Sequence, residues 1–424
     1  MPKKRKQRLL VLWNQSEPDV YERFQEEGAR PLDWDPERMA AEVTTVQDEM
    51  DAFIDALREG PLDVVCVNVE DDIDRLIAAI RLHQPDVIFN LVEFFYDDET
   101  LEPNIAGLYE LFDVPYTGNT PHTLAACQRK GRTKLLLEDA GLPIASYTIV
   151  HREPVPRPED LELRYPLIVK PANEDASGGI EPESVVHDYD ALVERCRYLL
   201  TEFEQPALVE EYIEGREIHA AVLGNERPEV LPLFEMEFDD SEFNPDDEWR
   251  PQIISYSAKW DPHSKDFYSM EPVCPAEGLG DEVEARIRDV AVAAYRVMGC
   301  RDYARIDMRV DDKGQPFILE VNPNPDLADG SAYMMCAEQS GRSYAQTLLE
   351  ITKMALSRGH VPEEPAEEAR SASTDLMNRK YSKRPTPRAC PKCGAALPHR
   401  SETAPPERAE TAPNEPAKTG STSG

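Results

Sequence analysis

The sequence predicts a protein that begins with an α/β domain, continues with α+β lobes and ends in a disordered tail. In the first part of the chain, short apolar runs alternate with amphipathic helical patterns. Strands separated by helices form parallel sheets that are covered on both faces. Residues 1–120 are therefore expected to form the first domain. Its strands are predicted at 9–13, 64–69 and 87–91, and its helices at 43–58 and 73–83.

Strand and helix patterns are mixed after the first domain, and we expect two α+β lobes, 121–215 and 216–357. A single long helix is predicted over 123–140, because Gly141 and Pro143 would end it. The other strands are predicted at 167–170, 207–212, 217–223, 253–257, 303–310 and 316–322, and the other helices at 191–203, 281–298 and 343–357.

The last part of the chain, 358–424, has a different composition. It is rich in Pro, Glu, Ala, Ser and Thr and has few large apolar residues, so it is expected to be disordered. Cys390 and Cys393 form a Cys-x-x-Cys knuckle within it. A structural zinc site needs four ligands, so this pair is half a zinc site at most, and an idle pair is an equal reading.

Charge and hydropathy limit the partners. The net charge is −36, from 82 acidic and 46 basic residues, and a field of that sign repels nucleic acids and anionic lipid. Apolar runs stay well short of the roughly 20 residues of a membrane span. The eight cysteines show no disulfide-framework spacing. We expect a cytoplasmic protein that binds neither nucleic acid nor membrane.

A predicted hairpin carries the main candidate metal site. Strands 303–310 and 316–322 are joined by a short turn, and a turn at Lys313-Gly314 sets Asp307 opposite Glu320 and Arg305 opposite Asn322. Alternation then places Ile306, Met308, Leu319 and Val321 on the other, packed face. Facing carboxylates repel each other unless a cation lies between them. Carboxylate and amide oxygens suit magnesium, so Asp307, Glu320 and Asn322 are candidate ligands. The alternative is a solvent-exposed face on which arginines balance the charge of the carboxylates.

Two other segments have features of a nucleotide site. The apolar strand that ends at Lys170 is followed by Ser177, Gly178 and Gly179, a flexible loop whose N–H groups can approach phosphates. A lysine there places a cation at the phosphates. The next strand ends in Glu210 and Glu211, and Glu217 follows. Carboxylates at that position can accept hydrogen bonds from ribose hydroxyls, and the alternative for the Glu pair is a solvated strand end.

Together these segments resemble the ATP-grasp superfamily, and within it the D-alanine–D-alanine ligases. The likeness runs from about Asp86 to Thr352. It is carried by the following motifs: Lys134-Leu-Leu-Leu-Glu-Asp-Ala-Gly-Leu-Pro143, Pro166-Leu-Ile-Val-Lys-Pro-Ala172, Leu208-Val-Glu-Glu-Tyr-Ile-Glu-Gly-Arg-Glu217, Cys274-Pro-Ala276 and Leu319-Glu-Val-Asn-Pro323.

The resemblance implies an ATP-grasp fold, in which two lobes clasp ATP, and roles for individual residues. ATP and Mg²⁺, with Mn²⁺ as an alternative, are the implied cofactors, and a homodimer is the implied assembly. Lys134, Lys170 and Lys259 match phosphate-contacting lysines; Glu210, Ile213 and Glu217 match the adenosine contacts; Asp307, Glu320 and Asn322 match the metal ligands; Arg305 and the backbone near Asp326 match the oxyanion contacts; and Ser331 matches the contact to the acceptor's carboxylate.

The implied reaction joins a carboxylate to an amine through an acyl phosphate. The sequence departs from the family mainly where substrates would bind. Glu17 is the candidate grip on the first substrate, but the family's glycines around it are missing. The family's His-Gly pair is replaced by Asn90-Leu, and its glycine after the metal-binding Asn is replaced by Asp326. The simplest interpretation is that the enzyme carries out the same reaction on a different donor or acceptor. Its substrates would be amino acids or related small molecules.

Two readings from different classes follow. The first is an ATP- and magnesium-dependent carboxylate–amine ligase. The second is a nucleotide-binding scaffold without activity that uses the C-terminal tail to bind partners. The complete set of lysines and metal ligands favours the ligase, because a degenerate enzyme is expected to lose at least one of them.

Overall fold

The computed structural model describes residues 5–16, 21–22, 24, 30–41, 43–174, 177–239 and 249–359. Glu17, Cys390 and Cys393 lie outside the described residues, as does the tail beyond residue 359. The predictions for them therefore stay predictions. None of the described helices is both long enough and apolar enough to cross a membrane.

The first sheet has three parallel strands in the order β2–β1–β3. Alternate residues of β1 point to opposite faces: Leu9 and Val11 pack with α2 and α12, while Leu10 and Leu12 pack with α3 and α4. The predicted parallel sheet with two covered faces is confirmed. The bounds are β1 Gln7–Trp13, α2 Val46–Arg58, β2 Leu62–Asn68, α3 Ile73–His83, β3 Val87–Leu91, η1 Glu99–Leu101 and α4 Glu102–Leu111.

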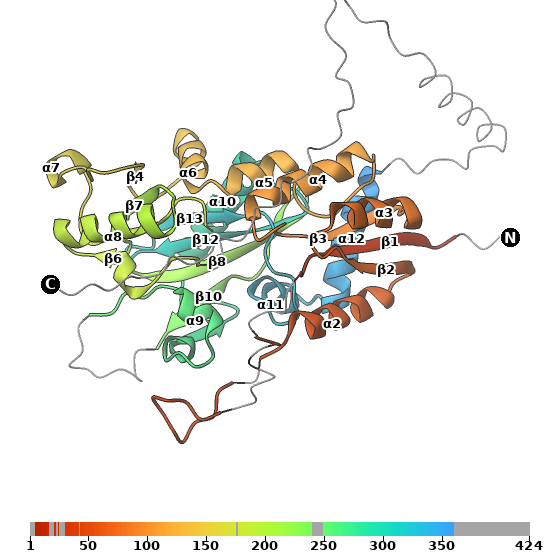
Figure 1. Cartoon of the computed structure of the whole chain (residues 1–424), viewed down its shortest axis with the longest axis horizontal. Helices are drawn as coiled ribbons and strands as arrows, with labels where there is room; N and C mark the ends of the chain where they lie inside the picture. The colour runs from red at the N-terminus through yellow and green to blue at the C-terminus, as the bar shows by residue number, and fades with distance from the viewer. Residues whose placement is uncertain are drawn as a thin grey trace, which may run out of the picture. The chain divides into compact units, whose positions relative to one another are not determined.

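Two further sheets lie side by side in Figure 1. One has the order β4–β7–β5–β6, and the other has the order β11–β10–β8–β12–β13 with β9 added to β8. Both lie in the predicted α+β lobes. Their elements are β4 Tyr147–Val150, α7 Pro158–Leu161, β5 Leu167–Pro171, η2 Pro182–Ser184, β6 Val185–Val186, α8 Tyr189–Glu202, β7 Ala207–Glu211, β8 Arg216–Leu223, β9 Glu229–Val230, β10 Phe234–Phe238, η3 Asp266–Ser269, β11 Met270–Val273, α10 Asp281–Val297, β12 Tyr303–Val310 and β13 Pro316–Asn322.

The large sheet has one face for packing and one for the site. Ile218, Ala220 and Val222 of β8 are buried against the helix α10. Glu217 and His219, which alternate with them, line a cavity on the other face. Of the last two helices, α11 (Ala332–Gln339) packs against β8 and β10 of the large sheet, and α12 (Tyr344–Arg358) packs against α2 and against β3 of the first sheet. Residues far apart in sequence thus share one core, which brings the first sheet to the edge of the cavity.

Two predicted elements are wrong. The long helix 123–140 is two helices, α5 (Pro121–Cys127) and α6 (Lys130–Asp139), because Arg129 leaves the helical region at φ −97° and ψ 89°. The Thr133 hydroxyl caps the break by donating to the carbonyls of Ala126 and Cys127, at 3.0 and 3.3 Å.

The predicted strand 253–257 is a loop that leads into the short helix α9 (Tyr256–Trp260). The apolar pair Ile253 and Ile254 gives this stretch the sequence pattern of a strand. In the structure the two side chains line the cavity instead of packing in a sheet. Ser255 starts the helix, since its Oγ accepts a hydrogen bond from the backbone N of Ala258 at 3.1 Å.

Candidate active site

A cavity of about 870 Å³ lies over the exposed face of the large sheet. Strands β8, β12 and β13 form its floor, and β5 and β7 contribute one wall. The loop after β1, helix α9 and the start of α11 complete it. The cavity has two ends with different residues. The hairpin end contains Lys130, Lys170, Glu210, Asp307 and Glu320, and the loop end contains Glu93, Asp97, Asp326 and Ser331.

The hairpin register agrees with the prediction at the candidate metal ligands. Asp307 pairs with Glu320, and Arg305 pairs with Asn322. A register shift follows between Asp307 and Met308, so Met308 pairs with Ile318. The predicted position of Leu319 on the packed face is therefore wrong: Ile318 is buried there, and Leu319 lines the cavity beside Glu320.

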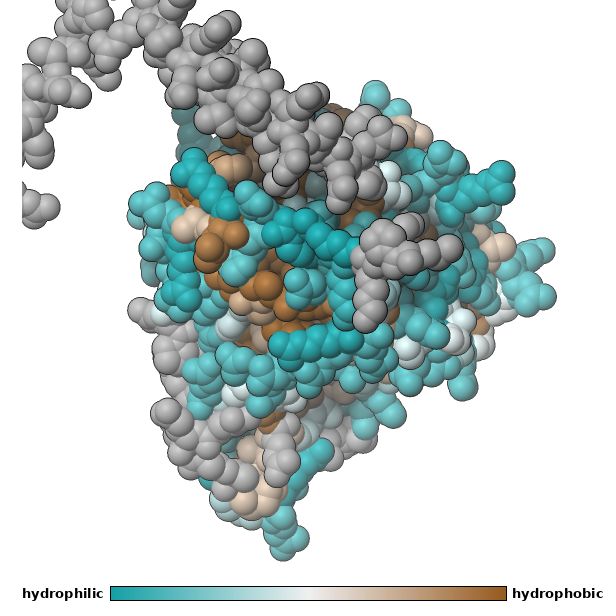
Figure 2. All heavy atoms as spheres, turned by 90° about the vertical axis from the view of Figure 1, so that its right-hand side faces the viewer, coloured by the Kyte–Doolittle hydropathy of each residue, from teal (hydrophilic) through white to brown (hydrophobic). Residues whose placement is uncertain are grey.

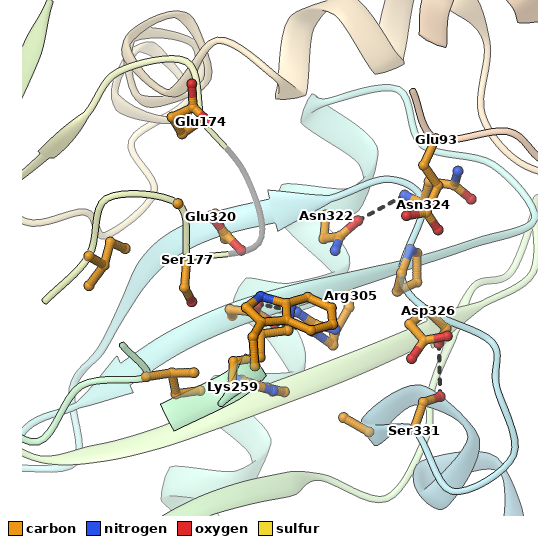
Figure 3. Close-up of a pocket in the computed structure, with 18 of the residues that line it drawn as sticks. Glu93, Glu174, Ser177, Lys259, Arg305, Glu320, Asn322, Asn324, Asp326 and Ser331 are labelled. Atoms are coloured by element: carbon orange, nitrogen blue, oxygen red, sulfur yellow. Dashed lines mark hydrogen bonds and ion pairs between the residues drawn. The ribbon is translucent and has the colours of Figure 1, made fainter. Parts of the chain in front are cut away.

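Each carboxylate of the hairpin is paired with a cation. The Arg305 guanidinium donates two hydrogen bonds to Asp307, both at 2.7 Å. The Lys130 ammonium lies 3.2 Å from Glu320 Oε2, and its charge is the main reason that the pKa of Glu320 is held well below the usual range. Asn322 lies on the same side, where its Oδ1 accepts from the backbone N of Asn324 at 2.9 Å (Figure 3). Two carboxylates and an amide oxygen thus face the cavity together.

Lys130 was missed by the sequence reasoning, which favoured Lys134 one helical turn later. Lys134 is 1% exposed and forms an ion pair with Glu210, whose other oxygen lies 2.7 Å from the Lys170 ammonium. Burial lowers the pKa of Lys134, against the opposing effect of Glu210. Burial alone raises the pKa of Glu210, but the two lysines outweigh it and the net shift is downward. Lys170 and Glu210 line the cavity, whereas Lys134 lies behind its wall.

The predicted adenosine segment lies along another wall. Glu211 lines the cavity, but its carboxylate also receives two hydrogen bonds from Arg164, which lower its pKa. Glu217 and the segment at Ile213 are joined by Arg309, whose guanidinium reaches the Ile213 carbonyl at 3.2 Å and Glu217 at 3.4 Å. Ile168 of β5 and Leu319 of β13 add apolar side chains to the same cavity.

Arg309 and His219 are further cavity residues that the sequence reasoning did not assign. Arg309 is 3% exposed and continues the alternation of Arg305 and Asp307 on β12. Its position on that face could therefore be predicted from the sequence. His219 follows Glu217 by two residues and is the cross-strand partner of Asp307. Its ring stacks on Phe234 at 5.3 Å. No local pattern marks His219, because its place depends on the pairing of β8 with β12.

The Ser177–Gly179 loop has the backbone conformation that glycine favours. Ser177 and Gly179 both have φ of 65°, and Ser177 and Gly178 line the cavity. A Cβ at Gly179 would lie 2.7 Å from the Phe203 ring. Gly179 is therefore required for close packing, and its carbonyl accepts from Arg195 at 2.6 Å.

Lys259 lies on α9 and lines the cavity, with its ammonium 4.8 Å from the Trp260 ring centre. The Tyr21 hydroxyl donates to the Lys259 carbonyl at 3.2 Å. Residues 30–41 are called the 30–41 segment. They contact the residues that follow α9. The Trp34 indole donates to the His263 carbonyl at 3.0 Å, and the Arg38 guanidinium lies 4.1 Å from the Tyr268 ring centre. The 30–41 segment thus contacts residues that follow the helix with Lys259.

The loop end has a different chemistry. Ser331 begins α11, and its hydroxyl donates to the Asp326 carbonyl at 2.9 Å (Figure 3). The Asp326 side chain is exposed, and its carboxylate accepts from the backbone N of Ala328 at 2.8 Å. Glu93 and Asp97, from the loop after β3, line the same cavity.

Comparison with known proteins agrees with this geometry. A family model described as D-ala D-ala ligase C-terminus matches residues 136–353. The chain is 34% identical to the D-alanine–D-alanine ligase of Alcanivorax borkumensis over 257 residues, 60% of this chain and 73% of that one. It is 33% identical to the uncharacterized protein y4sG of Sinorhizobium fredii over 359 residues, 82% of this chain and 96% of that one.

Among solved structures, the crystal structure of the D-alanine–D-alanine ligase from Bacillus anthracis complexed with ATP is similar, with a TM-score of 0.61 and 20% identity. It covers 84% of this chain and 98% of that one. The fold is therefore that of the ATP-grasp enzymes, as predicted. The chain belongs to the D-alanine–D-alanine ligase family. It is an ATP-dependent carboxylate–amine ligase, and the scaffold alternative is not favoured.

Proposed function

We propose that this enzyme uses ATP and Mg²⁺ to activate a small carboxylic acid, an amino acid or a related molecule, as an acyl phosphate and then transfers the acyl group to an amine. The observation that carries the proposal is the pairing of Asp307 with Glu320, next to Asn322, at the cavity floor. Within the described residues, no three His, Cys, Asp or Glu side chains form a metal cluster. Two carboxylates and an amide instead fit Mg²⁺, which takes few protein ligands and completes its shell with phosphate oxygens and water.

Asp307, Glu320 and Asn322 would hold the metal, with Mn²⁺ as an alternative to Mg²⁺. A bound metal would neutralise charge on the phosphates and so favour phosphoryl transfer. Lys130, Lys170 and Lys259 line the cavity and supply the remaining positive charge. Lys134 would act indirectly, since it fixes Glu210 between two ammonium groups.

The adenine ring would lie between Ile168 and Leu319, whose apolar side chains line the cavity. Ile213 lies beside them, and its backbone N–H and neighbouring carbonyls can read the edge of a base. Glu217, held by Arg309 and followed by His219, is placed to accept a hydrogen bond from a ribose hydroxyl. The Ser177–Gly178 turn would cover the phosphates with backbone N–H groups.

The reaction has two steps in this proposal. A carboxylate oxygen of the donor attacks the γ-phosphorus, the bond between the β–γ bridging oxygen and that phosphorus breaks, and ADP leaves. An amine then attacks the acyl carbon, the C–O bond to phosphate breaks, and phosphate leaves as the amine loses a proton. Arg305 would stabilise the oxyanion, because its guanidinium lies on the cavity face of β12. Glu17 stays the predicted grip on the donor, and Ser331 a predicted acceptor contact.

Several assignments rest on the family and on surface properties. We place the enzyme in the cytoplasm, without nucleic-acid or membrane partners. A homodimer is supported by the edge strand β2, where Val64, Val65 and Val67 are only partly buried. Figure 2 shows hydrophobic side chains between hydrophilic ones on the face at that end of the molecule. Zinc at Cys390 and Cys393 stays a prediction.

The metal assignment is tested by Glu320→Gln, which removes one charge with little change of shape. We expect ATP-dependent phosphate release in a screen of amino acids and amines to fall by about 100-fold or more, as for a lost transition-state contact. Asp312→Asn is the matched control, because Asp312 is exposed in the turn of the same hairpin. Equal phosphate release by Glu320→Gln and the wild type would remove the hairpin from the mechanism.

A further inference from the structure

The charged side chains of the cavity are distributed differently at its two ends. At the hairpin end, cations and carboxylates form pairs: Lys130 with Glu320, Lys170 with Glu210, and Arg305 with Asp307. At the loop end, neither Asp97 nor Asp326 has a cationic partner among the described residues, although both line the cavity. The loop end is therefore negative where the hairpin end is balanced.

In this structure the Ser331 hydroxyl uses its proton within the loop. A serine hydroxyl has a single proton, and that of Ser331 is directed to the Asp326 carbonyl at 2.9 Å. Its oxygen is left with lone pairs, so it can accept a hydrogen bond but has no second proton to donate. A substrate carboxylate at this place would also lie beside the Asp326 carboxylate, which repels it. An ammonium, which only donates, would find Ser331 Oγ and the Asp326 carboxylate on the same loop.

We infer that the amine substrate carries a second, cationic group at the loop end, an ammonium or a guanidinium, in the place where an amino-acid acceptor would carry its carboxylate. The inference rests on the proposed ligase function and specifies the acceptor. It also changes the role expected for Ser331, from donor to a carboxylate to acceptor from a cation. Asp326 becomes the residue that determines acceptor specificity.

The chemistry at the reacting centre is unchanged by this substrate. The unprotonated amine of the acceptor forms the new C–N bond with the acyl phosphate. The C–O bond breaks, phosphate leaves with the electron pair, and the amine loses one proton. The cationic group takes no part in bond making, and it fixes the distance of the reacting amine from the acyl carbon.

A series of three acceptors tests the charge at one position while the rest of the molecule stays similar: D-alanine, its neutral amide and 1,2-diaminopropane. Each is incubated with the full-length enzyme, ATP, Mg²⁺ and a panel of amino acids as donors, and products are identified by mass spectrometry. We expect kcat/KM to rise from the carboxylate to the amide to the cation. The cation should exceed the carboxylate by about tenfold, the scale of a charge-assisted hydrogen bond at a partly exposed site.

Asp326→Asn tests the residue itself, because Asn keeps the oxygen that accepts from Ala328. We expect this variant to lose the preference for 1,2-diaminopropane and to gain in activity with D-alaninamide relative to it. Asp329→Asn is the matched control: it removes the same charge from the same loop, but Asp329 does not line the cavity. The control should keep the order of the three acceptors.

Calorimetric binding of the same acceptors, with Mg²⁺ and a non-hydrolysable ATP analogue, separates the two levels of the proposal. If no donor supports turnover, the ligase chemistry fails, while binding of 1,2-diaminopropane in the wild type but not in Asp326→Asn still supports the inference. If D-alanine binds or reacts as well as the cation, the inference is overturned and the ligase function stands. An Asp326→Asn variant that keeps the wild-type order of acceptors would likewise overturn it.

Discussion

The two ends of the cavity are built from different kinds of structure. At the hairpin end, charged side chains lie on paired strands or at the start of a helix, and each has a partner of opposite charge, as Glu320 has Lys130. At the loop end, Asp326 and Ser331 lie on a connection between β13 and α11, and Asp326 is exposed. Ladder hydrogen bonds fix the first set of positions, whereas few neighbours constrain the second.

This difference explains where the chain agrees with its family and where it departs. A change at Asp307 or Glu320 would leave a buried or half-buried cation without its partner, which is costly. A change at Asp326 alters charge on an exposed loop at little cost to folding. The acceptor can therefore change while the nucleotide site is kept, and each variant below tests one end against the other.

The largest effect is expected for Lys130→Met. This change removes a cavity-lining cation, so we expect kcat/KM for ATP to fall by about 100-fold. The free energy of unfolding by urea should fall by no more than about 1 kcal/mol, since the hairpin ladder and the pair between Arg305 and Asp307 remain. Steady-state phosphate release checks the first expectation, and unchanged activity would exclude Lys130 from the nucleotide site.

Lys134→Met should show the opposite pattern. Lys134 is fully buried, and its loss leaves Glu210 with Lys170 alone. We expect the free energy of unfolding to fall by about 3 kcal/mol, the scale for breaking a buried ion pair. Circular dichroism during urea unfolding measures it. A variant as stable as the wild type that has lost activity would instead give Lys134 a direct role at the phosphates.

A smaller effect is expected where the 30–41 segment holds the region after α9. Trp34→Ala removes the hydrogen bond to His263 and the contact with Tyr268 at 5.5 Å between ring centres. Without these contacts the Lys259 side chain should sample a wider range of positions. We therefore expect KM for ATP to rise by about five- to tenfold with a smaller change in kcat. Met39→Ala is the control, because Met39 is exposed in the same segment. A Trp34→Ala enzyme with wild-type KM would show that this contact is purely structural.

The smallest effect concerns pH. The pKa of Glu320 is held below its ordinary value of 4.5, chiefly by Lys130, so its ionisation stabilises the fold at neutral pH and this contribution is lost as pH falls below that value. In Lys130→Met the pKa should return toward 4.5. The gap in stability between the variant and the wild type should therefore narrow between pH 7 and pH 3, by at most about 1 kcal/mol, since Glu320 is 31% exposed. Urea titrations at both pH values test this, and a gap that widens at acid pH contradicts it.

Local patterns were sufficient for the parallel sheet and for the hairpin pair of Asp307 and Glu320. They failed where the answer depended on tertiary contacts. Lys130 and Lys134 lie one turn apart on the same face of α6 and are equally plausible in sequence, but Lys134 is buried against Glu210 of β7, whereas Lys130 reaches Glu320 of β13 in the cavity. Leu319 reached the cavity through a register shift that alternation does not predict. The hydrogen bond from Ser331 to the Asp326 carbonyl depends on the conformation of their loop, for which sequence carries no signal.

Positional isotope exchange in ATP labelled at the β–γ bridging oxygen tests most directly whether the two ends have separate tasks. With a donor carboxylate and no acceptor amine, reversible formation of the acyl phosphate scrambles the label. We predict exchange in the wild type and in Asp326→Asn, and none in Glu320→Gln. Loss of exchange in Asp326→Asn, or exchange in Glu320→Gln at the wild-type rate, would contradict the division between a nucleotide site on the hairpin and an acceptor site on the loop.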